Sequence, residues 1–274
     1  MKLALLVVTT FVFALIGGLA PVLLRQRINA TTARRLAGIA GGLLIGSALL
    51  VVVPEGLHLA EVATDDPSSF FANREIALTS VILVGFLLML FLEGIGIGHD
   101  VHEEHHQHED GHGHGHVHHP QSLALLPIGL TIHAAADGLA IGAAGSASSA
   151  AAATLIMLAV IAHKMPAAFS LGVFLSHHHE SPKRVARDVV IFALATPVMI
   201  VFSYWFVDGS ATLSALALLF SAGTFLYVAT VDTLPMVHDP NTGRSAALYL
   251  GLGALLLLAM LVGFELSGWD IDPH

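Results

Sequence analysis

The sequence predicts an all-α integral membrane protein with eight transmembrane helices and both termini on the extracytoplasmic side. Of its 274 residues, 55% are hydrophobic and only 11% are charged, whereas a soluble domain usually carries about 25% charged residues. The chain also contains eight apolar segments of the length, about 20 residues, that a helix needs to cross a hydrocarbon layer of about 30 Å. Most of the chain is therefore expected to face lipid or other helices.

The predicted spans are, in chain order, 3–24, 36–59, 76–97, 122–144, 151–175, 189–207, 212–234 and 246–267. Each is expected to be helical, because unpaired backbone groups are costly in lipid and no segment alternates like a barrel strand. We interpret the first segment as a span rather than a secretory signal, because its apolar run is long and arginines follow it. In the second span, Gly38, Gly42 and Gly46 recur every four residues and predict close packing against another helix.

The positions of lysine and arginine predict the orientation, because these residues favour cytoplasmic loops. The loops at 25–35, 98–121, 176–188 and 235–245 lie on one side of the membrane and hold eight of the eleven basic residues. The other side holds only Lys2 and Arg74, and Lys164 lies inside the fifth span. This distribution places both termini outside. The small number of lysines, the many alanines and the short loops favour a multi-pass protein of the plasma membrane.

Composition also limits the possible ligands. The formal charge of −9 and the lack of a basic, aromatic-interleaved patch argue against a nucleic-acid partner. The chain has no cysteine but 18 histidines. Any metal must therefore be bound by nitrogen and oxygen ligands.

The fourth and fifth spans carry the polar residues that are most unusual for a membrane interior. His133 and Asp137 are four residues apart and share one helix face. His163 lies about 12 residues into the next span, so both imidazoles are about 18 Å deep from opposite sides. The linker GSASSA is short and favours antiparallel neighbours. Two imidazoles and a carboxylate can thus converge near the midplane, where such groups usually mark an ion pathway.

Two other features of the fifth span are unexpected at this depth. Lys164 follows His163 directly, and Pro166 removes an intrahelical hydrogen bond to the carbonyl of Ala162. We expect that carbonyl to be available to water or a metal. Gly138, which follows Asp137, is expected to allow a close helix approach.

The loop at 98–121 contains ten histidines and several acidic residues, and its composition predicts a disordered cytoplasmic segment. Neutral imidazoles bind Zn, Cu, Ni and Fe. A second histidine cluster lies in the next inner loop. The residues that we expect to chelate metal on the cytoplasmic side are His112, His114, His116, His118, His119, His177, His178 and His179.

The chain resembles the Zrt/Irt-like protein (ZIP) family of divalent-metal transporters. The specific stretches are VPEGLH, IHAAADGLAIGAA, HKMPAAFSLGVFL and LFSAGTFLYVAT, and they are most similar to the ZIP nine-type branch. The resemblance implies a single transporter domain over 1–274 that moves Zn2+ into the cytoplasm and is not an enzyme. It also implies alternating access by a unit of spans one, four, five and six, in a homodimer. Fe2+, Mn2+ and Cd2+ are further candidate substrates.

The resemblance assigns His133, Asp137 and His163 to the ligand positions of the family's primary transport site. Three positions depart from the family pattern: Ala134 replaces Asn, Lys164 replaces an acid, and Ala167 replaces a second His or Glu. These missing groups would complete a second metal site, so one bound metal is expected. We hypothesise that Lys164 takes the charge role of the second metal or pairs with Asp137 in the empty state. The competing hypothesis is that Lys164 points away from Asp137, towards a cavity or another acid such as Glu55 or Glu93.

Five other polar residues within spans are weaker candidates for the ion pathway: Ser47, Glu55, His58, Glu93 and Asp232. Glu55 and His58 lie near the outer end of their span and are expected to receive incoming ions. Glu93 and Asp232 lie near cytoplasmic ends and are expected to serve release. Interfacial caps or packing hydrogen bonds are the alternative interpretation for each.

Two other functions remain open at this stage. A zinc-exporting cation diffusion facilitator also has histidine-rich loops, but it usually has six spans and a soluble C-terminal domain. A membrane-embedded zinc hydrolase could use the same three ligands, but no H-E-x-x-H motif is present. The chain also lacks a G-x-x-x-x-G-K-[ST] motif, which would indicate ATP binding. Transport driven by gradients, or by capture at the cytoplasmic histidines, is the favoured interpretation.

Overall fold

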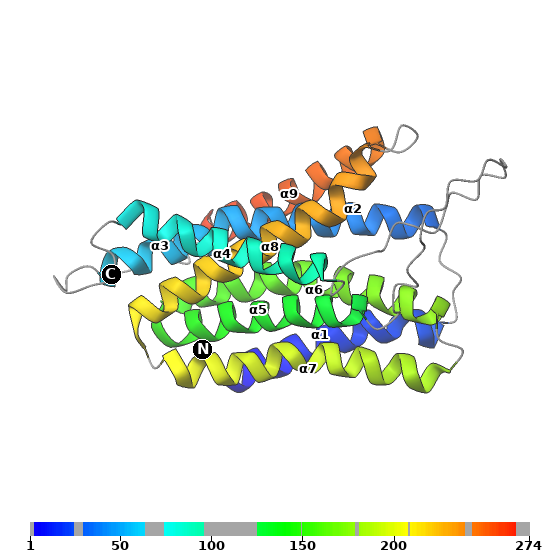
Figure 1. Cartoon of the computed structure of the whole chain (residues 1–274), viewed down its shortest axis with the longest axis horizontal. Helices are drawn as coiled ribbons and strands as arrows, with labels where there is room; N and C mark the ends of the chain where they lie inside the picture. The colour runs from blue at the N-terminus through cyan, green and yellow to red at the C-terminus, as the bar shows by residue number, and fades with distance from the viewer. Residues whose placement is uncertain are drawn as a thin grey trace.

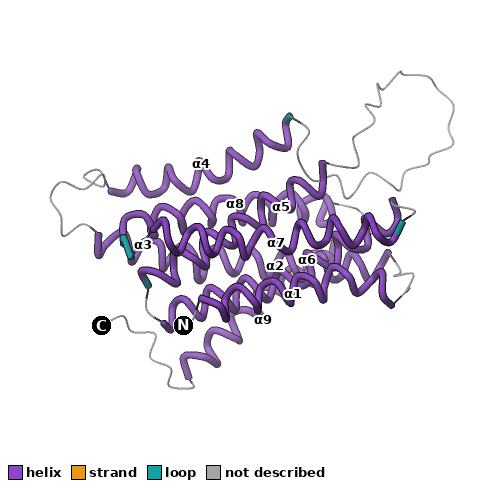
Figure 2. The backbone as a smooth tube through the Cα atoms, turned by 90° about the horizontal axis from the view of Figure 1, so that it is seen from below, coloured by secondary structure: helices purple, strands orange, loops and turns teal. Residues whose placement is uncertain are grey.

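The chain folds into a bundle of helices that run roughly along one common axis (Figures 1 and 2). The computed structural model describes residues 3–24, 30–63, 74–95, 125–148, 150–178, 181–207, 209–238 and 243–266. Over these residues, eight helical spans are long and apolar enough to cross a membrane, and no strand is present. The predicted fold class is confirmed. The loop at 98–121 and His179 lie outside the described residues.

The helices are α1 Leu3–Leu24, α2 Ala30–Ser47, α3 Val53–Val62, α4 Arg74–Gly94, α5 Leu125–Ala147, α6 Ala150–His178, α7 Pro182–Val207, α8 Ala211–His238 and α9 Gly243–Leu266. A π-helix, η1 Ala48–Val52, joins α2 to α3 within one span. Pro54 lies in the first turn of α3 and has no N–H to donate to the preceding turn. The π-helix thus begins directly after Ser47 and ends two residues before Pro54.

Several helices are longer than the predicted spans. Helix α7 begins at Pro182 rather than 189, and α6 continues to His178 rather than 175. Apolar length predicts only the part within lipid, whereas a helix continues into polar residues wherever a cap supports it. At the start of α7, the carbonyl of Ser181 accepts hydrogen bonds from the N–H groups of Arg184 and Val185. Helix α6 also continues through Pro166 without interruption.

The helices form two groups that meet at the centre of the bundle. Helices α1, α5, α6 and α7 pack on one another, and α2, α3, α4, α8 and α9 form the second group (Figure 1). The groups touch where α5 packs against α8 and where α6 packs against α2. Helices α5 and α6 are antiparallel neighbours, as their short connection predicts.

Glycines allow the closest helix contacts. A Cβ atom on Gly46 would lie 2.9 Å from the side chain of Leu257, and one on Gly42 would lie 2.8 Å from the backbone nitrogen of Ala254, so the predicted glycine face of α2 packs on α9. On α5, a Cβ atom at Gly138 would lie 2.7 Å from Cβ of Met199 on α7. The helix that carries His133 and Asp137 is therefore held tightly against α7.

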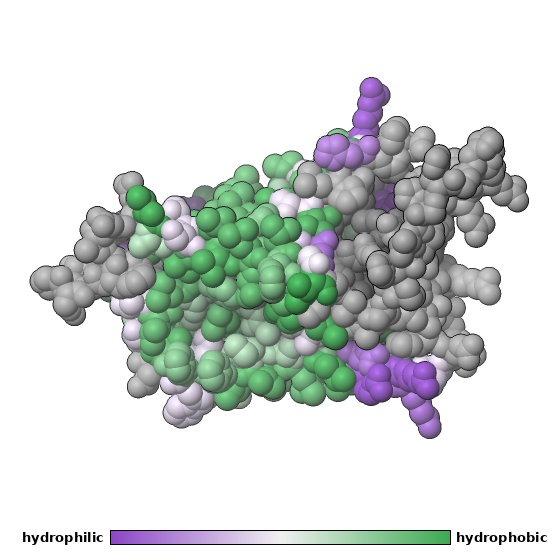
Figure 3. All heavy atoms as spheres, viewed as in Figure 1, coloured by the Kyte–Doolittle hydropathy of each residue, from purple (hydrophilic) through white to green (hydrophobic). Residues whose placement is uncertain are grey.

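The surface of the bundle matches a lipid environment. A broad apolar band covers the face shown in Figure 3, and hydrophilic residues gather at one end. Leu83, Phe91 and Trp205 are among the large apolar side chains that are more than half exposed. The exposed basic residues among those described include Arg35, Lys183, Arg184 and Arg244, which lie at the ends of spans.

Candidate metal site

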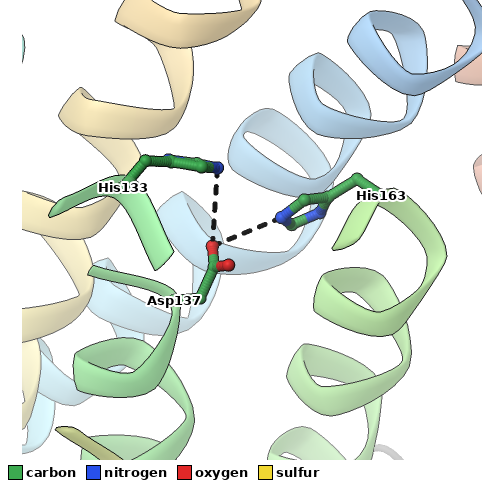
Figure 4. A group of neighbouring side chains, drawn as sticks. All are labelled: His133, Asp137 and His163. Carbon is green, nitrogen blue, oxygen red and sulfur yellow. Dashed lines mark hydrogen bonds and ion pairs between the residues drawn. The ribbon is translucent and has the colours of Figure 1, made fainter. Parts of the chain in front are cut away.

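The structure brings His133, Asp137 and His163 together at the centre of the bundle (Figure 4). His133 and Asp137 come from successive turns of α5, and His163 comes from α6. All three side chains are almost fully buried. One ligand atom from each residue lies within 4.8 Å of the others, and within the described ranges this is the only such group of three or more His, Asp or Glu residues.

The carboxylate of Asp137 lies between the two imidazoles. Its Oδ1 atom is 3.7 Å from Nε2 of His133 and 3.3 Å from Nε2 of His163. Ligand atoms around a tetrahedral zinc ion, with bonds of about 2.0–2.1 Å, are about 3.3 Å apart. Small side-chain movements can therefore place all three atoms around one ion.

Backbone contacts orient the imidazole of His163. Its Nδ1 atom is 2.9 Å from the carbonyl oxygen of Ala159, one turn earlier in α6. A hydrogen bond from Nδ1 to a carbonyl holds the ring with Nε2 directed at a metal. The hydroxyl of Ser47 also lies 3.3 Å from the Ala159 oxygen and 2.7 Å from that of Leu43. Ser47 therefore contacts the turn that positions His163.

Lys164 forms a buried ion pair with the same carboxylate. Its Nζ atom lies 3.0 Å from Oδ2 of Asp137, on the oxygen that does not face the imidazoles. The ammonium also lies 5.0 Å from the centre of the Phe192 ring, which is within range of a cation–π interaction. The buried cation and anion thus compensate each other. This contact agrees with the hypothesis of a Lys164–Asp137 pair rather than with Glu55 or Glu93 as partner.

Hydroxyl groups on two neighbouring helices tie this site to its surroundings. Thr196 of α7 donates to the carbonyl of Ala134, at 2.6 Å, and Ser221 of α8 donates to that of Ala136, at 3.0 Å. These carbonyls belong to the residues that follow His133 and precede Asp137. The ligand-bearing turn of α5 is therefore held on both sides.

Comparison with known proteins identifies the family. Residues 96–267 match the family described as ZIP Zinc transporter. Zinc transporter ZIP9-A of Xenopus laevis is 31% identical over 307 aligned residues, which cover 96% of this chain and 98% of that protein. This chain belongs to the ZIP zinc transporter family. Zinc transporter ZIP9 of Xenopus tropicalis is 30% identical with the same coverage, and Zinc transporter ZIP9 of Macaca fascicularis is 40% identical over half of this chain.

Membership of the ZIP family confirms the resemblance seen in the sequence motifs. It favours a transporter over the hydrolase and over a cation diffusion facilitator, because the ZIP family comprises transporters of metal ions. The two stretches that carry His133, Asp137 and His163 both lie inside the matched region.

The weaker pathway candidates whose side chains the structure describes do not join the three-residue cluster. Glu55 and His58 are half-buried on α3. Glu93 accepts a hydrogen bond from the hydroxyl of Tyr227, which joins α4 to α8 and favours the packing interpretation for this residue. The side chains of Asp232, His177 and His178 lie outside the described part of the structure, as do His112, His114, His116, His118 and His119.

Sequence reasoning missed the contribution of α8. The ring of Phe225 packs against both imidazoles, with ring centres 5.3 Å from His133 and 5.5 Å from His163. Ser214 and Ser221 are seven residues apart, so they share one face of α8, and Phe225 follows one turn later. This spacing within an apolar helix is the signal that could have indicated a face directed at the site.

Proposed function

We propose that this chain moves Zn2+ across the membrane and that the ion binds transiently to Nε2 of His133, Oδ1 of Asp137 and Nε2 of His163. The observation that carries the proposal is the convergence of these three buried ligand atoms within 4.8 Å in the middle of a membrane-spanning bundle. Imidazole and carboxylate groups suit Zn2+. The relatives named as zinc transporters support the choice of ion.

The site is suited to transit rather than to permanent storage. Structural zinc sites usually have four protein ligands, whereas this one offers three and leaves a position for water. The positive charge of Lys164, 3.0 Å from Asp137, further weakens the attraction of the site for a cation. An ion bound in this way can leave. Lys164 thus takes the place of a second metal, and the site holds one ion.

We infer inward transport from the resemblance to ZIP transporters, and the orientation of the bundle from its basic residues. Exposed basic residues at the start of α2, α7 and α9 favour the cytoplasmic side for that end of the bundle. Zn2+ then moves inwards across the plasma membrane, and both termini lie outside. Fe2+, Mn2+ and Cd2+ are alternative substrates that the same transport assay can test.

Alternating access requires that the site face each side of the membrane in turn. The site lies on α5 and α6, which belong to one packing group, and it faces α2 and α8 of the other group. Movement of α1, α5, α6 and α7 as a unit against the remaining helices would carry the ion across. We further propose that the chain forms a homodimer, as the family resemblance implies.

Uptake of radiolabelled zinc into proteoliposomes tests the function. The variants His133→Ala, Asp137→Ala and His163→Ala should each reduce uptake to the level of empty liposomes, because each removes one of three ligands. His238→Ala removes an exposed imidazole at the end of α8 and should retain the native rate. Native uptake by all three site variants would contradict the proposed site, and a native protein without uptake would contradict transport itself.

A further inference from the structure

Phe225 completes a cluster of three rings at the proposed metal site. The ring centres of His133, His163 and Phe225 form a nearly equilateral triangle with sides of 5.3, 5.5 and 5.9 Å. The phenyl ring meets the imidazoles at interplanar angles of 74° and 64°, and its side chain is completely buried. An apolar wall that offers no ligand atom therefore covers one side of the imidazole pair.

The donor atoms around this wall are few and rich in nitrogen. The cluster supplies two imidazole nitrogens and one carboxylate oxygen, because the second oxygen of Asp137 contacts Lys164 at 3.0 Å. Zn2+ accepts four ligands with nitrogen among them. Mn2+ prefers oxygen ligands in an octahedral arrangement. To bind here, Mn2+ would have to bring about three waters into space that the phenyl ring partly fills.

Hydrogen bonds from α8 to α5 hold the phenyl ring in this place. Ser214 donates to the carbonyl of Ala143, at 3.2 Å, and Ser221 donates to that of Ala136, at 3.0 Å. Ser221 lies one turn before Phe225 on the same face of α8. The register between the two helices is thus fixed next to Asp137, so a shift of α8 that carried the ring away would break a buried hydrogen bond.

We propose that Phe225 is a specificity-determining residue whose ring closes one side of the site and favours four-coordinate Zn2+ over six-coordinate Mn2+. The inference rests on the proposed function, because it assigns a selectivity to the same three ligands. Phe225 acts by limiting the coordination number rather than by touching the ion. The prediction is a change in the ratio of metals bound, beyond any change in total binding.

The experiment compares Phe225→Ala and Phe225→Leu with the native protein, purified as the full chain. Competition of Mn2+ against radiolabelled Zn2+ measures the selectivity. Phe225→Ala should lower the preference for Zn2+ by about tenfold, a size typical of one altered pocket contact. Phe225→Leu keeps part of the apolar volume and should give a smaller change in the same direction. Phe86→Leu removes an edge-to-face ring contact of 5.2 Å with Tyr227, elsewhere on α8, and should retain the native ratio.

Absorption spectra of the Co2+-loaded proteins provide a second readout. The native protein should show the intense visible bands of tetrahedral Co2+, and Phe225→Ala should show the weaker bands of higher coordination. A native metal ratio and a tetrahedral spectrum in both Phe225 variants would overturn the proposal. Equal loss of every metal in both variants would also overturn it, because the ring would then serve only to support the fold. Failure of native protein to bind Zn2+ would instead contradict the proposed function.

Discussion

The ammonium of Lys164 lies 3.0 Å from Oδ2 of Asp137, and neither side chain is accessible to solvent beyond 2%. The other oxygen of the carboxylate faces the imidazoles of His133 and His163. The two oxygens of Asp137 therefore have different partners: the imidazoles on Oδ1 and the ammonium on Oδ2. An acid that would be very costly alone in a membrane interior is compensated before any metal arrives.

Removal of the cation should destabilise the metal-free protein. Lys164→Met leaves the buried carboxylate of Asp137 without its partner, and breaking a buried ion pair in this way costs about 3–5 kcal/mol. Unfolding in detergent, followed by circular dichroism, measures the change. Added Zn2+ should restore part of the loss, because the metal supplies positive charge at the same carboxylate. The double variant with Asp137→Asn should lose less stability than the two single changes summed.

Reversal of the charge at the same position should change the number of bound metals. Lys164→Glu places a second acid beside Asp137, on the side where the native ammonium lies, and two neighbouring carboxylates favour a second divalent ion. Metal analysis of purified protein should give two Zn2+ per chain for this variant and one for the native protein. One ion per chain in both would show that Lys164 does not take the place of a second metal.

Loss of the Ser221 hydroxyl should weaken zinc binding as well as the fold. The hydroxyl of Ser221 bonds to the carbonyl of Ala136, beside Asp137, whereas Ser203 makes the same kind of bond to Leu139, further along α5. Each alanine variant should lose about 0.6 kcal/mol of stability, the average for such bonds in membranes. Ser221→Ala alone should also raise the Kd for Zn2+, by about threefold. Equal affinity in the two variants would contradict a positioning role for Ser221.

A methyl group at Gly138 should force α5 away from α7. The added Cβ atom would lie 2.7 Å from Cβ of Met199, so Gly138→Ala should cost about 1–3 kcal/mol through overpacking. Asp137, the adjacent residue, should bind Zn2+ less tightly as a result. Gly251→Ala on α9 is the matched control, since a Cβ atom there would meet nothing within 4 Å. Thermal unfolding and zinc titration of both variants measure the difference.

The sequence predicted the spans and the central cluster because both depend on local patterns. Apolar length predicted the eight spans, and the spacing of His133 and Asp137, with the short linker to the span of His163, predicted that the three residues meet. Helix ends were less predictable, since Ser181 and Pro182 extend α7 beyond its apolar part. The serine spacing on α8 could have indicated the face that carries Phe225, but not its contact with the imidazoles, because that contact depends on how α8 packs against α5.

The Asp137–His163 contact spans only 26 residues of sequence, all within one helical hairpin. Contacts between near neighbours in sequence form faster than distant ones. During synthesis, the proposed zinc ligands can thus meet as soon as α5 and α6 have both been inserted. Phe225 and the serines of α8 join afterwards, when most of the polypeptide has left the ribosome. The proposed metal site can therefore form early in synthesis, and the α8 side chains that cover it join later.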